Sequence, residues 1–137
     1  MTASAVAVPS PEVRMVAPLP GFDGEEFFEL TPIDEGGVLM SMRSVRTPQL
    51  RFVLTAADTF FDDYRPVLGP EVTEALGVDT AAGLQVLLVL SIPTGLLDAT
   101  ANMRAPIVVE PVHGRAVQVV LDDDALSMRR PLLAAVG

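Results

Sequence analysis

The feature that most constrains the fold of this chain is a series of short apolar segments separated by turns rich in Pro and Gly. Two of them, residues 38–44 and 50–55, partly alternate apolar and polar side chains, as a strand with one buried face does. The segment "LQVLLVLS" (84–91) is apolar on both faces apart from Gln85 and Ser91, which indicates a central strand covered on both sides. Further strand candidates are 13–17 and 27–31.

Many short strands with turn signals between them are typical of antiparallel barrels and sandwiches. We therefore expect a mostly β protein, a small antiparallel barrel-like domain with one or two short helices. The runs "PIVVEPV" and "RAVQVVL" flank His113-Gly114, which predicts a hairpin with a two-residue turn in which Gly114 takes a positive φ. Pro111 lies inside the first run, and this predicts an edge or a bulge at that position.

One helix is well signalled, at "GPEVTEALG" (69–77). Pro70 suits the first helical position, Glu71 the first turn, and Gly77 the C-terminal stop. The segment "TFFDDYRP" (59–66) predicts a turn or short helix with aromatic anchors at Phe60, Phe61 and Tyr64. The end of the chain, "DDDALSMRRPLL", predicts a turn followed by an extended or helical piece.

Length and charge limit the kinds of partner. A chain of 137 residues fits one domain, and we expect a flexible tail over residues 1–11 and a single domain over 12–137. The net charge is −9, and every cation is Arg, which disfavours nucleic acid and anionic membranes as partners. A basic protein would be attracted, although solubility is the simpler reason for the acidity.

The sequence also bears on compartment. The first residues lack the basic region of a signal peptide, and the longest apolar run is far shorter than the roughly 20 residues of a membrane-spanning helix. There is no Cys, so neither a disulfide nor a thiolate metal site can form. We expect a soluble, cytoplasmic protein.

Few residues suggest chemistry. His113, the single His, sits in a predicted turn and is interpreted as an ordinary turn residue, so no metal or cofactor site is expected. Asp122-Asp123-Asp124 is interpreted as a solvated turn or as a surface for Arg or Lys of a partner. Asp62-Asp63 suits local capping better than paired acid–base catalysis. With no nucleophile motif, phosphate loop or Lys, we expect no catalytic residue and no enzyme.

Met residues suit either a core or an adaptable binding surface. Met40 and Met42 are assigned to the core, because they lie on the apolar face of a predicted strand. Met103 and Met128 lie in turn-like regions, so we expect them to be partly exposed.

The order of four stretches resembles the flagellar assembly factor FliW family. They are "LPGF" (19–22), "LRFVLTAADTFFDDYRP" (50–66), "TANMRAPIVVE" (100–110) and "VQVVLDDDALSMRRPLL" (117–133), and the similarity covers residues 13 to 133. The chain departs from the family pattern at three places: Ala56-Ala57 stands for Asp-Pro, Pro18 for the Gly before "LPGF", and Met103 for Leu. These differences bear on local turn geometry.

The resemblance implies a fold and a function. FliW-like proteins are small, mostly β barrels that bind CsrA, a basic dimer that represses translation of flagellin messenger RNA, and that also bind flagellin. Such a protein would couple flagellin synthesis to export, as a monomer when free and with two copies per CsrA dimer in the complex. Two alternative functions also consist of protein binding: a flagellin-binding chaperone without a CsrA role, and an unrelated acidic β-barrel binding module. The third alternative is an enzyme with a carboxylate site, which requires two acids with raised pKa values in one cleft.

The stretch "TANMRAPIVVE" has two interpretations, and both stay open. In the structural one, Pro106 restricts Ala105 to extended geometry while Asn102 bonds nearby backbone groups, which produces a bend that sets the register of the last hairpin. In the functional one, the bend carries a partner surface. The predicted partner-binding residues are Asp62, Asp63, Asn102, Met103, Arg104, Asp122, Asp123 and Asp124.

Overall fold

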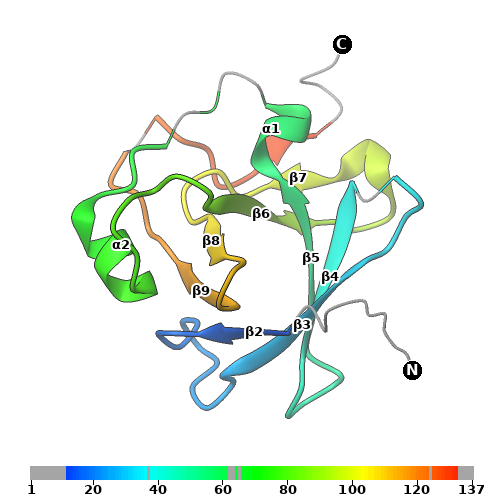
Figure 1. Ribbon diagram of the computed structural model, residues 1–137. Coiled ribbons are helices and arrows are strands. Elements are labelled where there is room, and N and C mark those ends of the chain that lie inside the picture. The colour runs from blue at the N-terminus through cyan, green and yellow to red at the C-terminus, as the bar shows by residue number, and fades with distance from the viewer. Residues whose placement is uncertain (1–11, 37, 62–63, 65, 124, 133–137) are drawn as a thin grey trace.

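The computed structural model describes residues 12–132 except 37, 62–63, 65 and 124. The predicted N-terminal tail, residues 1–11, lies outside this part of the chain. In the described residues one nine-stranded sheet has the order β10-β7-β6-β5-β4-β3-β2-β9-β8. An additional pairing of β6 with β8 closes seven of these strands into a barrel (Figure 1). The expected small β barrel is therefore confirmed.

The barrel strands follow the predicted segments closely. Their bounds are β2 (Glu12–Met15), β3 (Phe27–Pro32), β4 (Leu39–Ser44), β5 (Arg51–Ala56), β6 (Gln85–Ser91), β8 (Ile107–Glu110) and β9 (Arg115–Gln118). Every pairing in the barrel is antiparallel except that of β2 with β9. A closed ring with an odd number of strands cannot alternate direction throughout, so one parallel pair is required.

The barrel interior is a hydrophobic core formed by alternate residues of these strands. Its fully buried members include Phe28, Met42 and Leu54, so the assignment of Met42 to the core is confirmed. Met40 packs against the same cluster and is half-buried.

The outer wall of the barrel is covered on two sides. Helix α2 (Pro70–Leu76) places Val72 and Leu76 against Val108 of β8. It begins with Pro70 at its first turn and ends at Gly77, whose φ of +73° is the left-handed conformation predicted for the stop. A second outer cluster contains Phe61, Tyr64 and Leu88, while Leu87 faces the interior, so β6 is covered on both sides as expected.

The last hairpin differs from its prediction. Strands β8 and β9 are joined by a four-residue loop, Pro111 to Gly114, so the predicted two-residue turn is wrong. Pro111 lies in this loop and not within a strand. The longer loop is held by the buried carboxylate of Glu110, which accepts hydrogen bonds from the backbone N–H groups of Val112 and His113. Gly114 has a φ of +68°, as predicted.

Several smaller elements complete the described part of the chain. Helix α1 (Ala57–Phe60) begins two residues before the predicted segment 59–66, without a side-chain cap at Ala56. Phe61 and Tyr64 are buried, which confirms them as anchors. Two short strands pair with each other: β7 (Thr100–Ala101) and β10 (Arg130–Pro131). The 3-10 turn η1 (Leu96–Asp98) precedes β7. No helix among the described residues is long and apolar enough to cross a membrane.

Candidate functional site

The site is built on the bend that follows β7. The side-chain oxygen Oδ1 of Asn102 accepts hydrogen bonds from the backbone N–H groups of Arg104 at 3.0 Å and Ala105 at 3.2 Å. The Asn102 N–H itself donates to the carbonyl of Val89 on β6. The bend is thereby fixed to the barrel wall, and Pro106 is fully buried at the start of β8. The predicted bonds from the Asn102 side chain to nearby backbone groups are confirmed, without any positive φ at Asn102. That the bend sets the register of the last hairpin stays a prediction.

Arg104 connects the bend to the C-terminal segment. Its Nε and one terminal nitrogen donate to the carbonyl of Leu126 at 3.2 and 3.0 Å. Backbone bonds join the same two segments, from Leu121 N–H to the Arg104 carbonyl and from Met103 N–H to the Ser127 carbonyl. The chain between residues 121 and 127 is therefore anchored at both ends to the bend.

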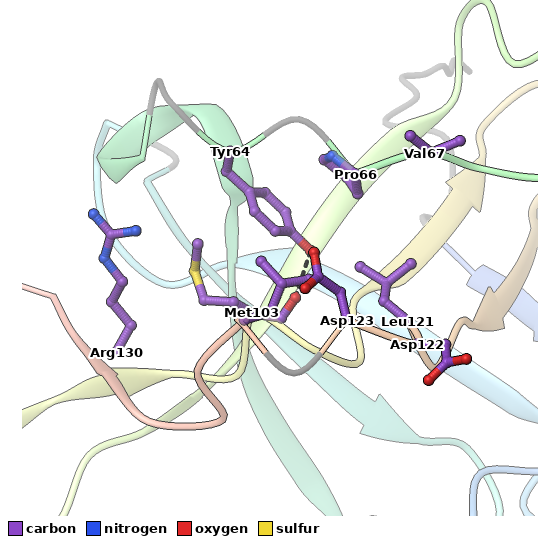
Figure 2. A pocket seen from close by; sticks show the side chains of 9 residues that line it. Tyr64, Pro66, Val67, Met103, Leu121, Asp122, Asp123 and Arg130 are labelled. Atoms are coloured by element: carbon purple, nitrogen blue, oxygen red, sulfur yellow. Dashed lines mark hydrogen bonds between the residues drawn. The ribbon is translucent and has the colours of Figure 1, made fainter.

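A cavity of about 410 Å³ lies between this anchored segment and the chain that follows α1. Tyr64 forms one wall, and its hydroxyl donates to the Met103 carbonyl at 2.7 Å (Figure 2). Burial raises the pKa of Tyr64 to about 12. The phenol thus stays protonated at neutral pH and holds the two sides of the cavity together.

The rim of the cavity carries charge. Asp122 and Asp123 line it and are exposed, and Arg130 lies on the opposite side from Asp122 (Figure 2). The guanidinium of Arg130 stacks over the ring of Phe61 at 4.7 Å from the ring centre. Asp123 also accepts a hydrogen bond from the backbone of Ala125, so its carboxylate stabilises the local turn as well.

The structure brings together some of the predicted partner-binding residues. Met103, Asp122 and Asp123 line the cavity, whereas Asn102 lines a smaller pocket and Arg104 bonds the Leu126 carbonyl without lining the cavity. The expected exposure of Met103 is wrong: its side chain is 2% exposed, because the Asn102 bend turns it into the outer cluster. Met128 is 57% exposed, as expected. Asp62, Asp63 and Asp124 lie outside the described residues.

Sequence reasoning missed several cavity residues. The cavity is also lined by Pro66, Val67, Leu121, Leu126 and Arg130. All but Val67 fall within the matched stretches 50–66 and 117–133, but none of them was predicted to bind a partner. They are distant in sequence from the Asn102 bend, and tertiary pairing alone brings them together. Val67 was detectable in principle as an apolar residue between two predicted elements, and it is 87% exposed.

In the described part of the chain, the carboxyl groups with displaced pKa values lie away from this cavity. Side-chain hydrogen bonds from Ser44 and Thr47 lower the pKa of Glu25. Burial alone would raise the pKa of Glu110, but bonds from His113 and the backbone outweigh burial and lower it. Among the described residues no group of three or more His, Cys, Asp or Glu side chains is placed to hold a metal ion.

Comparisons with known proteins agree with this architecture. A family model described as FliW protein matches residues 4–132. The flagellar assembly factor FliW of Syntrophotalea carbinolica is 35% identical over 126 residues, which cover 92% of this chain and 89% of the relative. The corresponding factor of Bacillus licheniformis is 33% identical over 114 residues, covering 83% of this chain and 80% of the relative.

A solved structure gives the same result in three dimensions. It is described as the crystal structure of the flagellar assembly factor FliW, and it matches this chain with a TM-score of 0.82 at 28% identity. The match covers 89% of this chain and 85% of the solved one. The barrel order, the family model and these relatives agree, and this chain belongs to the FliW protein family.

Proposed function

We propose that this protein is a flagellar assembly factor that works in the cytoplasm by binding proteins rather than by catalysis. Its partners in this proposal are a CsrA-type regulator and flagellin, and binding to one releases the other. The relatives' name, flagellar assembly factor, supports the first part of the proposal. The exposed acidic rim of the cavity is the observation that supports a basic partner.

The charge of the rim suits CsrA. Asp122 and Asp123 are exposed beside a cavity of about 410 Å³ in a chain of net charge −9. A basic dimer would be steered toward such a surface, and Arg side chains would bind carboxylates through charge-assisted hydrogen bonds. A two-fold symmetric dimer presents its basic surface twice, so two copies of this protein would bind.

Apolar groups beside the rim suit a helix of flagellin. Val67 lines the cavity and is 87% exposed, and Met128 is 57% exposed in the segment that precedes β10. An amphipathic helix binds a groove through a few apolar anchors on one face, and Met adapts readily to such anchors. A catalytic function has less support, because among the described residues the displaced carboxyl pKa values, those of Glu25, Asp98 and Glu110, are lowered, whereas a general acid needs a raised one.

The test is a calorimetric titration of this protein with the CsrA homologue of the same organism, repeated after saturation with flagellin. We expect binding that flagellin abolishes. A double variant, D122N/D123N, keeps the side-chain shape and the oxygen that accepts from Ala125 but removes two charges. It is expected to bind CsrA more weakly and with a smaller dependence on salt.

The matched control is the double variant E74Q/D79N, which also removes two exposed charges, on and just beyond α2, and neither residue lines the cavity. It should leave CsrA affinity unchanged. Equal affinities of the double variant and the wild type would remove the rim from the CsrA site. No CsrA binding at all, with flagellin still bound, would leave a flagellin-binding chaperone and refute the regulatory part of the proposal.

A further inference from the structure

The outer face of strands β2 to β5 carries a row of four charges in strict register. Cross-strand pairing places Glu12 opposite Glu29, Glu29 opposite Arg43, and Arg43 opposite Arg51. All four side chains are exposed. Across the barrel wall, the row therefore reads as two negative charges followed by two positive charges.

The two ends of this row are unfavourable within one molecule. Like charges directly opposite each other on neighbouring strands destabilise a sheet, and the row contains such a pair at each end, whereas Glu29 and Arg43 at its centre are opposite charges. Among the described residues Arg14–Glu26 is the one pair of an Arg and a carboxylate, so neither Arg43 nor Arg51 has a carboxylate within 4.0 Å there. Other arginines have defined contacts: Arg46 donates to the Gly24 carbonyl, and Arg115 to the Leu76 carbonyl.

Two apolar side chains lie beside the centre of the row. Phe27 on β3 is 43% exposed, and Val45, just after β4, is 47% exposed. The Val45 N–H donates to the Phe27 carbonyl, so these residues are neighbours across the β3–β4 boundary. We call these six residues the charged strip: Glu12, Phe27, Glu29, Arg43, Val45 and Arg51.

The strip is complementary to itself. Consider a second copy that packs face to face on the strip and is related to the first by a two-fold axis, which runs parallel to the strands between β3 and β4. Across this contact, the charges of the second copy follow the opposite order. Glu29 of one copy then meets Arg43 of the other, Glu12 meets Arg51, and Phe27 meets Val45. Glu12 and Arg51, which face only a like charge within the row of one copy, gain counter-charges, and the two apolar side chains are covered. We propose that the charged strip is the contact surface of a symmetric homodimer of this chain.

The size of the strip limits the strength of this dimer. Six side chains per copy are far fewer than the roughly 20–30 residues per partner in a standard stable interface. Exposed ion pairs each contribute about 0.2–1 kcal/mol, and the charge of −9 on each copy opposes association. The dimer is therefore weak and reversible, and the protein should be a monomer in dilute solution.

The inference is independent of the proposed function. No residue of the strip lines the cavity beside Tyr64, so a dimer would leave that cavity open. The occupant is identified by charge order: an acidic peptide would match Arg43 and Arg51 but leave Glu12 and Glu29 without partners. A second copy matches all four.

Sedimentation velocity over a range of protein concentrations at moderate salt tests the proposal. We expect the sedimentation coefficient of the wild type to rise with concentration. The single variants E29R and R43E should lose this rise, because each places like charges opposite each other in the dimer. The double variant E29R/R43E has the wild-type net charge and restores both contacts, so it should regain the rise.

The single variants separate the effect of charge pairing within the contact from the effect of the net charge of the protein. E29R reduces the net charge from −9 to −7 and would strengthen association if overall repulsion were decisive. Glu74→Arg makes the same change on α2, away from the strip, and should associate at least as well as the wild type. Circular dichroism confirms that each variant is folded. A wild type that stays monomeric at every concentration, or a double variant that does not recover, would overturn the proposal.

Discussion

Replacing Tyr64 by Phe tests how the cavity is held together. The change removes one hydroxyl, which donates to the Met103 carbonyl at 2.7 Å, and leaves the ring in the outer cluster with Phe61 and Leu88. Tyr64 is 7% exposed, so water replaces the lost donor poorly. A buried carbonyl left without its partner costs about 1–3 kcal/mol, and we expect the free energy of unfolding to fall by about that amount at pH 8.

The pH dependence gives a second, independent signature. Burial raises the pKa of Tyr64 from 10.0 to about 12. Between these values the unfolded chain has lost the phenol proton while the folded chain retains it, so rising pH favours unfolding. The stabilisation is fully present below pH 10 and is lost as the pH approaches 12. At about 1.36 kcal/mol per pKa unit, the loss is at most about 2.7 kcal/mol.

The composition makes the titration of Tyr64 easy to separate from that of other side chains. The chain has one Tyr and neither Lys nor Cys, so no other side chain has an ordinary pKa between that of His and that of Arg, apart from the chain terminus. Urea unfolding followed by circular dichroism at pH 8, 10 and 11.5 gives the free energy, and tyrosinate absorbance follows Tyr64 alone. The wild type and Y64F should converge as the pH rises. Equal stability at pH 8, or a parallel decline of both proteins, would refute the assigned role.

Two further substitutions test the bend and the hairpin loop. Asn102→Ala removes the acceptor of two backbone N–H groups and should cost about 1–3 kcal/mol in urea unfolding, whereas Asn102→Asp keeps an acceptor and should cost less; equal losses would contradict the role of Oδ1. Glu110→Gln should destabilise the protein at neutral pH. Because the pKa of Glu110 is lowered in the folded state, its carboxylate stabilises the fold at pH values above the unfolded-state pKa, and this contribution is lost in acid. The free energies of unfolding of the two proteins should therefore converge as the pH falls. A constant difference down to pH 3 would show that ionisation of Glu110 is irrelevant.

The candidate site was only partly predictable from sequence. Asn102 was identified because an Asn before Ala-Pro has a local function: its side chain bonds the backbone two and three residues later. Met103 was misjudged, because a residue in a turn-like segment was expected at the surface and the bend instead directs it inward. Arg104 was predicted to contact a partner, and its bonds to the Leu126 carbonyl, 22 residues away, leave no local signal.

The sequence by itself determined the local elements and the family. Alternating apolar residues, Pro70 and Gly77 specify the barrel strands and α2, because periodicity and backbone restrictions act over a few residues. The tertiary structure alone decided the parallel β2–β9 closure and the pairing of β7 with β10. It also decided the meeting of Tyr64 with Met103 and the row of charges across β2 to β5. These features depend on contacts between residues far apart in the chain, and such contacts form when the barrel closes.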